Sequence, residues 1–414
     1  MKRIVMFAWL MLGATSLVAQ NQTKSPYTRY GYGKLADPSV VSLKGMGGIG
    51  YGVRNSQMIN TLNPAAYSAV DSMTFMLDIG VNMTVGNYKD GALSASKTTA
   101  GLDYLAIQFP LLRGLGMGVG LEPVSYVGYK YGQDAKVVQD EETVTGYETY
   151  SGTGGLNKIS SSLSYRIVKP LSLGVKVSYL FGTVAHGYVF TPAQTNDYSL
   201  TWSETLQASG FTYDFGLQYT QALSKTKSLT LGLVYIPKTN FGGDYTDVKP
   251  SGTTSIDTTF NYKGSLPETY GIGLTYNLRN RLTLGADVQY QRWGEVEFND
   301  FGDNNGLTDR LKINAGVEYI PNVLSRSFGD RLRYRAGVSY ANSYIIDSNL
   351  SKYSEYGIYI GFGIPMVDRR SFVNISMEYS RLTPQKTLSM NESFFKFTLG
   401  YTFNESWFRK RKLQ

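Results

Sequence analysis

The feature that most constrains this chain is a two-residue alternation of side chains, which is clearest in the stretch 266–293. Two runs there place Ile, Leu, Val and Tyr at every second position, with Gly, Thr, Asp and Gln between them. Successive side chains of a β-strand point to opposite faces of the pleat, so a period of two predicts a strand. The polar residues 277–281 between the runs are too few for anything but a hairpin turn.

One hairpin is compatible with two environments, because its apolar face can point into a dry core or out to lipid. The number of hairpins separates them, since the alternation continues over residues 72–403 and predicts fourteen strands. In single-chain bacterial barrels the strand number is even, the apolar face contacts lipid and the polar face lines the lumen. The sequence therefore predicts an all-β fold, a 14-stranded antiparallel transmembrane β-barrel in contact with the lipids of the bacterial outer membrane.

Tyrosine and charged residues are placed as such a barrel requires. Tyr suits a membrane interface because its ring is apolar and its hydroxyl is polar. The Tyr residues that end predicted strands are Tyr165, Tyr179, Tyr219, Tyr235, Tyr276, Tyr290, Tyr319, Tyr340, Tyr379 and Tyr401. A Lys or Arg that faces mid-bilayer lipid costs roughly 2 to 4 kcal/mol. The strand charges that fall on the lumen face instead are Asp78, Arg166, Lys176, Asp214, Asp287, Lys312, Glu318, Arg333, Arg335, Glu378 and Lys396.

The connections between the predicted strands alternate in length. The short ones are 110–113, 168–170, 224–228, 277–281 and 366–371, with 320–330 as a longer exception. The long, polar ones, which we predict to be loops, are 87–96, 132–152, 191–205, 239–263 and 299–306. Short turns on the periplasmic side and long loops on the outer side are typical of outer-membrane barrels.

Composition restricts the chemistry that the chain can perform. It has no Cys and a single His, His186, beside a predicted outer loop. Most metal sites and nucleophilic active sites use these residue types. We therefore expect no enzyme activity, no cofactor and no metal site, and a packing role for His186. The formal net charge is +8, but no basic stripe with interleaved aromatic residues is present, so we expect no nucleic-acid partner.

Both ends of the chain differ from the barrel. Residues 1–19 have a basic start, an apolar core over 4–13 and the cleavage pattern Leu17, Val18, Ala19. They predict a secretory signal peptide and export. After the last predicted strand, residues 404–414 form a basic tail. We interpret the tail as solvated, with contact to a periplasmic partner as the alternative.

Residues 20–71 do not alternate and are rich in Gly, Asn, Ser and Pro. Two interpretations are a disordered extension and a compact segment folded against the rest of the chain. The scattered Tyr, Met and Leu residues give more apolar surface than a disordered tail usually carries. A fourteen-stranded lumen is also wide enough to leak unless it is obstructed. We therefore predict that residues 20–71 form a plug, or hatch, for a barrel of residues 72–403.

Pro123 lies within the run 115–131 that contains the third predicted strand. Proline cannot donate to a strand ladder and is confined to edges, strand starts and bulges, whereas a closed barrel has no edge. Two interpretations remain open. Either the strand ends at Leu121 and the rest is loop, or the strand kinks and opens a gap in the wall.

Together these features resemble a known family. The turn 63–65 before the first strand, the interruption at Pro123 and the strands LPETYGIGLTY and RYRAGVSY are similar to FadL/TodX-type outer-membrane channels for long-chain fatty acids and other hydrophobic compounds. In that family an amino-terminal hatch blocks the lumen, and a kink in the third strand opens laterally to the bilayer. The residues to which the resemblance gives a role in the ligand path or its gate are Asn63, Pro64, Ala65, Glu122, Pro123 and Val124.

These expectations support two functions. The first is passive uptake of a hydrophobic small molecule such as a fatty acid, which enters from the loop side, binds beside the plug and leaves through the kink. The alternative is a non-transporting barrel subunit of a secretion or assembly complex, with other outer-membrane or periplasmic proteins as partners. Some barrels that resemble this family have that role.

Overall fold

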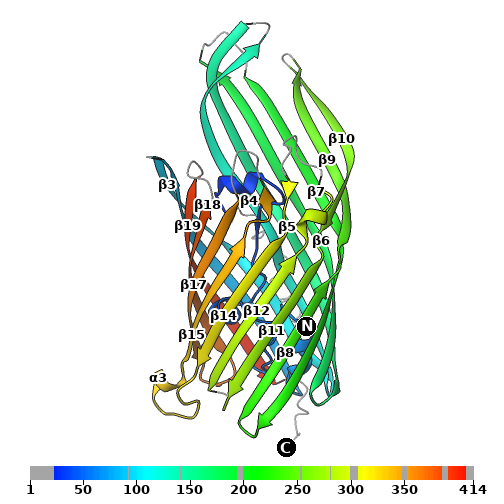
Figure 1. Ribbon diagram of the computed structural model, residues 1–414, viewed down its shortest axis with the longest axis vertical. Helices are drawn as coiled ribbons and strands as arrows, with labels where there is room; N and C mark the ends of the chain where they lie inside the picture. The colour runs from blue at the N-terminus through cyan, green and yellow to red at the C-terminus, as the bar shows by residue number, and fades with distance from the viewer. Residues whose placement is uncertain are drawn as a thin grey trace, which may run out of the picture.

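The computed structural model describes residues 23–91, 93–139, 142–193, 199–251, 254–279, 281–298, 306–346, 352–384 and 390–406 (Figure 1). The predicted signal peptide, nearly all of the connection 299–306 and most of the basic tail lie outside the described residues. Within the described residues, no helix has the length and apolar character needed to cross a bilayer.

Fourteen strands form a closed antiparallel barrel, as the alternation predicts. β8 pairs with β11, and the last strand, β19, pairs with the first wall strand, β2, which closes the barrel. The wall strands are β2 (Thr74–Asp90), β3 (Leu93–Leu112), β4 (Leu115–Gln139), β5 (Glu142–Val168), β6 (Leu171–Pro192), β7 (Leu200–Ser224), β8 (Lys227–Ile236), β11 (Thr269–Leu278), β12 (Leu282–Gln291), β14 (Arg310–Tyr319), β15 (Arg333–Asn342), β17 (Tyr353–Pro365), β18 (Phe372–Pro384) and β19 (Asn391–Ser406).

The wall is much taller on one side than on the other. β11, β12, β14 and β15 have 10 residues each, whereas β4, β5, β6 and β7 have 22 to 27 (Figure 1). The hairpin of β9 (Thr239–Ser251) and β10 (Thr254–Leu266) pairs with the upper part of β7 and extends the tall side. Because long connections mark the outer side of such barrels, we call residues 126–155, 182–210 and 239–266 the outer wall.

The prediction of long outer loops is wrong. The segments 87–96, 132–152 and 239–263 are largely paired strand, and both described ends of 191–205 are strand as well. Outside the bilayer the outward face of a strand meets water instead of lipid, so no continuous apolar face is required. The alternation therefore disappears although the backbone pairing continues, supported by Thr, Tyr and Val residues that favour strands.

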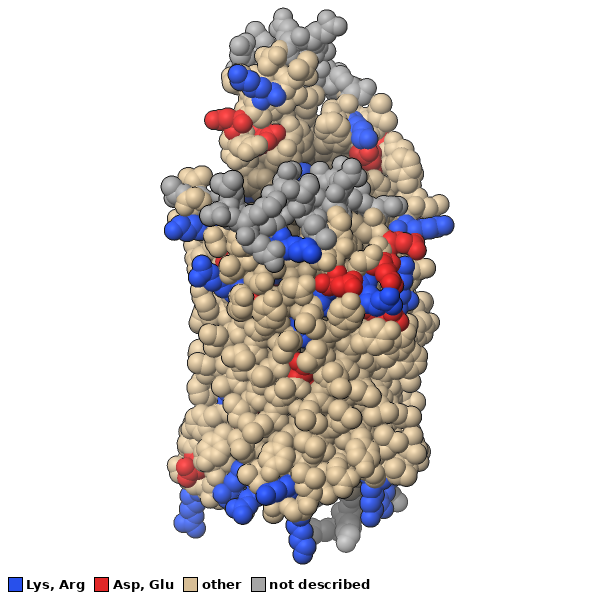
Figure 2. Space-filling view, in the orientation of Figure 1, with Lys and Arg blue, Asp and Glu red and all other residues tan. Residues whose placement is uncertain are grey.

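The wall directs apolar side chains outward and polar side chains into the lumen, as the sequence predicts for a transmembrane barrel. On β14, Ile313 is 41% exposed and faces outward, whereas Asn314 is 7% exposed and faces the lumen. The interface residues Tyr165 and Tyr179 are 53% and 43% exposed. Figure 2 shows the consequence, a broad band almost without charged side chains, with Lys and Arg below it and charges of both signs above it. An exposed apolar face and a buried polar face are the arrangement of a barrel whose outside contacts lipid.

Residues 23–71, which we call the interior segment, lie inside the barrel. They form η1 (Pro26–Arg29), β1 (Lys34–Leu35), α2 (Val41–Lys44) and η2 (Pro64–Ala69), joined by turns. A buried cluster unites their apolar side chains with the inner face of β2 and β3. Its residues are Val40, Val41, Leu43, Met46, Ile49, Val53, Met58, Ile59, Tyr67, Met76, Tyr104 and Ala106.

A second buried cluster lies towards the outer wall. It joins Tyr32 of the interior segment to Trp293 of η3 (Trp293–Glu295) and to Tyr344. The short strands β13 (Gly306–Leu307) and β16 (Ile345–Ile346) pair beside it, and α3 (Phe328–Arg331) lies in the turn at the opposite end of the barrel (Figure 1). The interior segment is therefore packed at two levels of the lumen.

Glycine residues on the inner face let the interior segment approach the wall closely. A Cβ atom added at Gly232 would lie 1.8 Å from the Tyr51 carbonyl oxygen, and one at Gly316 would lie 2.1 Å from the Met46 carbonyl oxygen. Real Cβ atoms do not approach so closely, so only Gly fits at these positions. The small inner-face residues therefore serve as contact sites for one particular segment.

Candidate functional site

Asn63, Pro64 and Ala65, the first group of predicted path residues, lie buried against the inner face of the wall. Asn63 caps η2, because its side-chain oxygen accepts a hydrogen bond from the Ala65 N–H at 3.0 Å. The side-chain amide of Asn63 donates to the Tyr51 carbonyl oxygen at 2.8 Å. On the wall, a Cβ atom at Gly216 would lie 2.2 Å from the Asn63 oxygen. The turn is thus held tightly between the interior segment and β7.

Glu122, in the second group, is the centre of a buried ion-pair network. Its Oε1 lies 3.1 Å from Lys176 Nζ and 3.3 Å from Lys158 Nζ, and Lys176 also lies 3.0 Å from Asp214. Buried charges cost several kcal/mol each unless they are paired. Lys176 donates further to the Thr61 carbonyl oxygen at 3.1 Å. Lys176 therefore connects Glu122 to Thr61 of the interior segment, just before the turn 63–65.

Pro123 marks an irregularity within β4 rather than its end. The interpretation that the strand stops at Leu121 is wrong, because β4 continues to Gln139. The ladder between β4 and β5 shifts its register between Pro123 and Ser125. Such a shift accommodates a residue that has no N–H to donate.

On its other side, β4 loses its strand partner at the same level. The ladder between β3 and β4 reaches only as far as the pair Leu105 and Leu121. Above this pair the interior segment replaces β3, since β1 pairs with β4 at Ser125 and the Ala36 N–H donates to the Val124 carbonyl oxygen at 2.9 Å. We call this place, where β1 instead of β3 borders β4, the wall break.

A cavity of about 170 Å³ lies beside the wall break. Its apolar lining includes Leu35, Leu62, Pro123, Val124, Ile236 and Leu266. Its polar lining includes Lys158, Asp214, Asp287, Gln289 and Asn314. A dry cavity of about 150 Å³ is large enough to hold benzene. The cavity therefore has room for a single aromatic ring, and less than a long acyl chain needs.

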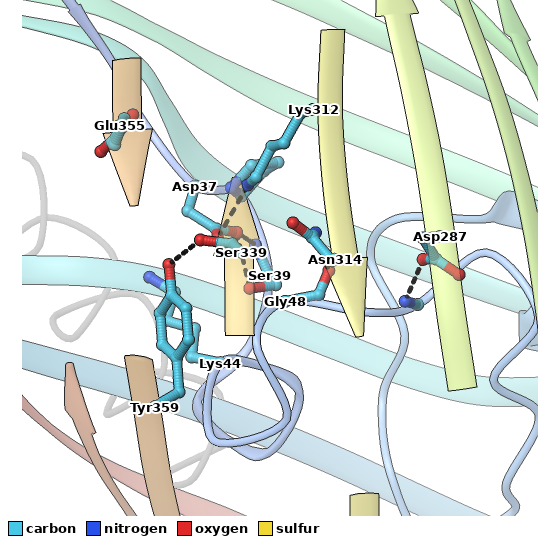
Figure 3. Close-up of polar contacts among 12 residues, drawn as sticks. Asp37, Ser39, Lys44, Gly48, Asp287, Lys312, Asn314, Ser339, Glu355 and Tyr359 are labelled. Atoms are coloured by element: carbon cyan, nitrogen blue, oxygen red, sulfur yellow. Dashed lines mark hydrogen bonds and ion pairs between the residues drawn. The ribbon is translucent and has the colours of Figure 1, made fainter. Parts of the chain in front are cut away.

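A second cavity, of about 90 Å³, shares a wall with the first. Residues 35–37 of the interior segment, together with Arg310 and Lys312, line both cavities. Asp37 Oδ2 lies 3.4 Å from Lys312 Nζ, and its Oδ1 accepts from the Ser39 hydroxyl at 2.6 Å (Figure 3). We call residues 35–37 the strap, because they separate the two cavities.

The charge on Asp37 is maintained by its neighbours. Burial raises the pKa of Asp37, but the ammonium groups of Lys312 and Lys44 and the hydrogen bonds from Ser39 lower the pKa by more. The net result is a pKa well below the ordinary value of an Asp carboxyl. At neutral pH the strap therefore carries a negative charge opposite Lys312.

Sequence reasoning missed a buried ion-pair anchor of the interior segment. Lys44 of α2 forms an ion pair with Asp103 of β3, and Lys396 of β19 lies 3.1 Å from the other oxygen of the same carboxylate. Asn82 donates to Asp103 at 2.9 Å. Asp103 is the one charged residue in the stretch 99–109, which has apolar residues on both faces and only Thr99 and Gln108 as further polar residues. A lone acid in such a strand is the sequence signal that points to an inward-facing partner.

Further contacts hold the interior segment from the opposite side of the lumen. Asp287 of β12 accepts hydrogen bonds from the backbone N–H groups of Gly50 and Tyr51 at 2.6 and 2.8 Å. Asn314 of β14 donates to the Gly48 carbonyl oxygen at 3.2 Å. Figure 3 shows Asn314 beside Gly48, and Asp287 on the neighbouring strand with its contact to the segment. The segment is thus tied to the wall by side chains from several strands.

His186 lies on the inner face of the outer wall. Its ring stacks on Tyr129 with 5.8 Å between centroids, and its Nδ1 lies 2.6 Å from the Tyr129 hydroxyl. These contacts are those of a packed side chain. Within the described ranges, no three His, Cys, Asp or Glu residues are grouped so that they could hold a metal ion.

Comparisons with known proteins give one family and one fold. A family model described as BamG matches residues 1–414. No curated protein matches the chain. The solved structure of the Ralstonia pickettii toluene transporter TbuX matches at 15% identity and a TM-score of 0.58, covering 88% of this chain and 98% of its own.

Two further solved structures give the same result. The P. putida toluene transporter TodX matches at 17% identity and a TM-score of 0.57, covering 92% of this chain and 99% of its own. A Pseudomonas aeruginosa FadL homologue matches at 13% identity and a TM-score of 0.57, covering 93% and 99%. At these identities the likeness concerns the fold, and it confirms the resemblance to FadL/TodX-type channels at that level.

Proposed function

This chain belongs to the BamG family and has the fold of the FadL/TodX-type outer-membrane channels, and from this premise we propose that it takes up small hydrophobic compounds across the outer membrane. The observation that carries the proposal is the cavity of about 170 Å³ beside the wall break, which is lined by apolar side chains such as Leu35, Val124 and Leu266 as well as by polar and charged ones. Export through the leader 1–19 is part of the proposal, because the barrel must reach the outer membrane to act there.

The path runs from the outer side to the wall break. The compound passes Arg310 and Lys312, rests beside Pro123 and Val124, and leaves laterally where β1 rather than β3 borders β4. Displacement of the strap joins the two cavities and lengthens the site. In this path a monoaromatic compound fits the cavity as it stands, whereas a long-chain fatty acid requires the strap to move.

The remaining predicted path residues act as supports. Glu122 does not line the cavity, but it fixes Lys158 and Lys176, of which Lys158 does. Asn63, Pro64 and Ala65 hold η2 against β7 and so keep Leu62 at the cavity. The proposal assigns these residues a structural role at the site and gives no residue a catalytic one.

The test fills the cavity without altering the rest of the wall. Val124→Trp places a large ring in the cavity, and Val119→Trp, the matched control, places the same ring on the lipid-facing side of the same strand. Cells that lack the native protein and express each variant are given radiolabelled toluene or radiolabelled laurate. We expect uptake to fall with Val124→Trp and to persist with Val119→Trp. Uptake that is the same with and without the protein would refute the proposal.

A second candidate function is a non-transporting subunit of an outer-membrane assembly or secretion complex. Two observations favour it. The family that matches the full length has a name distinct from those of the transport channels, and the buried ion pair between Lys44 and Asp103 ties the interior segment to the wall. Extraction of tagged protein in mild detergent would then yield a stoichiometric complex that the Val124→Trp substitution leaves intact. Recovery of the barrel alone would argue against this role.

A further inference from the structure

The six turns at the periplasmic end of the barrel, opposite the outer wall, share one pattern of side chains. Each turn carries an exposed Lys or Arg, and we call one such residue from each turn the basic rim: Arg113, Lys169, Lys225, Arg279, Arg326 and Arg369. In five of these turns an exposed Leu or Val lies within two residues of the rim cation. The most exposed of them are Leu324 at 80% and Val367 at 99%. A cation beside an exposed apolar side chain is thus repeated around the barrel.

The positive charge of the basic rim is not balanced by acidic residues. Asp330 and Asp368 are the only acidic residues in the sequence of these turns. They accept hydrogen bonds within their own turns, from the Ser325 hydroxyl at 2.7 Å and from the Ser371 hydroxyl at 2.6 Å. None of the ion pairs among the described residues includes a rim cation. Figure 2 shows Lys and Arg projecting beneath the band that is almost without charge.

The basic rim lies just beyond the Tyr residues that end the strands on this side. Lys169 follows Tyr165 by four residues, and Arg279 follows Tyr276 by three. Interface Tyr rings lie at the level of the lipid headgroups. A strand rises about 3.3 Å per residue, and the long Lys and Arg side chains add to this reach. The rim cations can therefore contact lipid phosphates, and lipid that covers the exposed Leu and Val side chains removes them from water.

The basic rim is densest where two neighbouring turns meet. β8 pairs with β11, and the Arg279 N–H donates to the Thr226 carbonyl oxygen at 2.6 Å. This hydrogen bond joins the turn that carries Lys225 and Lys227 to the turn that carries Arg279 and Arg281, and all four charged side chains are exposed. We call these four charged residues the basic corner. Lys and Arg are the side chains that bind phosphate groups most strongly, so the basic corner suits a phosphate.

We propose that the basic rim binds anionic phospholipids of the periplasmic leaflet, with the basic corner as the strongest site. The lipid phosphates pair with the cations, and the lipid covers the exposed Leu and Val side chains. An acidic protein fits the pattern less well, because it would cover one side of the barrel, whereas the rim continues through all six turns. No residue of the basic rim or the basic corner lines either cavity, so this binding is independent of the proposed uptake.

The experiment titrates purified full-length protein in detergent with dioleoylphosphatidylglycerol or dioleoylphosphatidylcholine and counts the bound lipids by native mass spectrometry. The two lipids have the same acyl chains and differ in the charge of the headgroup. We expect the anionic lipid to bind at least about fivefold more tightly, which is the effect of one Lys or Arg near an anionic surface. This preference should shrink as the salt concentration rises, because salt screens exposed charges.

The variant that tests the basic corner combines Lys225→Gln, Lys227→Gln, Arg279→Gln and Arg281→Gln. It should weaken the binding of phosphatidylglycerol about fivefold or more and leave the binding of phosphatidylcholine unchanged. The matched control removes the same total charge from exposed residues of the outer wall through Lys130→Gln, Lys136→Gln, Lys249→Gln and Lys263→Gln. It should keep the preference for the anionic lipid. Resistance of each barrel to unfolding in dodecyl sulfate shows that the variants are folded.

Three outcomes would overturn the proposal. They are equal binding of the two lipids, a preference that the variant of the basic corner retains in full, and a preference that the outer-wall control loses as well. An acidic protein that the native barrel retains and the variant releases, without any preference between the lipids, would make the rim a protein-docking surface instead. Val124→Trp separates this proposal from that of uptake, because it blocks the proposed path and leaves the basic rim intact.

Discussion

Ile313 and Asn314 are neighbours on β14, yet their surroundings differ because they lie on the two faces of the wall. Ile313 is exposed on the outside of the barrel, whereas Asn314 is buried and donates to the Gly48 carbonyl oxygen. The outer face has only to be apolar, since its solvent is lipid. The inner face has to match one segment of the same chain atom by atom. The outer face should therefore tolerate conservative changes that the inner face does not.

Among the substitutions that test this comparison, we expect the largest loss of stability from one on the inner face, at Asp103. Asp103→Asn leaves Lys44 and Lys396 buried without their carboxylate. Removing one partner of a buried ion pair typically costs about 3 to 5 kcal/mol. We expect the unfolding temperature in detergent to fall and the ion conductance of single barrels in planar bilayers to rise as the interior segment loosens.

The control for this substitution is Asp257→Asn on β10, where the side chain is exposed. It removes the same charge without breaking a buried pair and should change neither measurement. Equal conductance of the Asp103→Asn variant and the native barrel would show that other contacts are sufficient to hold the interior segment in the lumen.

The next effect is expected on the outer face, at Val338. This residue is 53% exposed and lies between Tyr334 and the interface residue Tyr340 on β15. Val338→Arg places a charge in lipid, at a cost of at most roughly 2 to 4 kcal/mol, the range for the middle of the bilayer. Urea titration of folding into liposomes measures the loss, and Val338→Leu is the neutral control. A stable Val338→Arg barrel would mean that this side of the strand is covered by protein.

The two faces also differ in how far the sequence reveals them. Alternation predicts the membrane parts of the strands and the outward direction of residues such as Ile313, because lipid imposes a simple rule. It predicts that Asp287 and Lys312 point inward, but not that they contact Gly50 and Asp37. Those pairings join residues that are distant in sequence, and no local rule specifies them.

The wall break is likewise only partly predictable from the sequence. Proline chemistry predicts an irregularity at Pro123, and the structure has one there. The sequence does not decide whether the strand continues past Pro123, because a proline is compatible both with a strand end and with a bulge. The replacement of β3 by β1 beside Val124 depends on the path of the whole interior segment. The roles of Asn63 and Glu122 in a ligand path remain predictions.

A smaller effect is expected from the glycine contacts of the inner face. Gly232→Ala brings a methyl group against the Tyr51 carbonyl oxygen, and overpacking of this kind costs typically about 1 to 3 kcal/mol. Gly306→Ala is the control, because its added Cβ has open space around it. Thermal unfolding followed by loss of strand signal in circular dichroism compares the two. Equal unfolding temperatures would show that the interior segment shifts easily away from β8.

The smallest effect is expected at the strap, where Asp37 and Lys312 form a pair that water still reaches. Their side chains are 23% and 19% exposed. Exposed ion pairs contribute about 1 kcal/mol or less, so Asp37→Asn should lower the unfolding temperature only slightly. The pKa of Asp37 in the folded protein is lowered by Lys312 and Lys44 despite burial. A lowered carboxyl pKa stabilises the folded state at pH values above the unfolded pKa of about 4.

This stabilisation is lost as the pH falls from about 4 through the lower pKa of the folded state. The native protein and Asp37→Asn should therefore differ by a constant amount between about pH 7 and pH 5 and converge in more acidic buffer. Unfolding temperatures of both proteins across this range measure the difference. Convergence already between pH 7 and pH 5 would contradict the assignment, because it requires a raised pKa. In that case burial would outweigh Lys312, and the strap would be neutral when a ligand passes it.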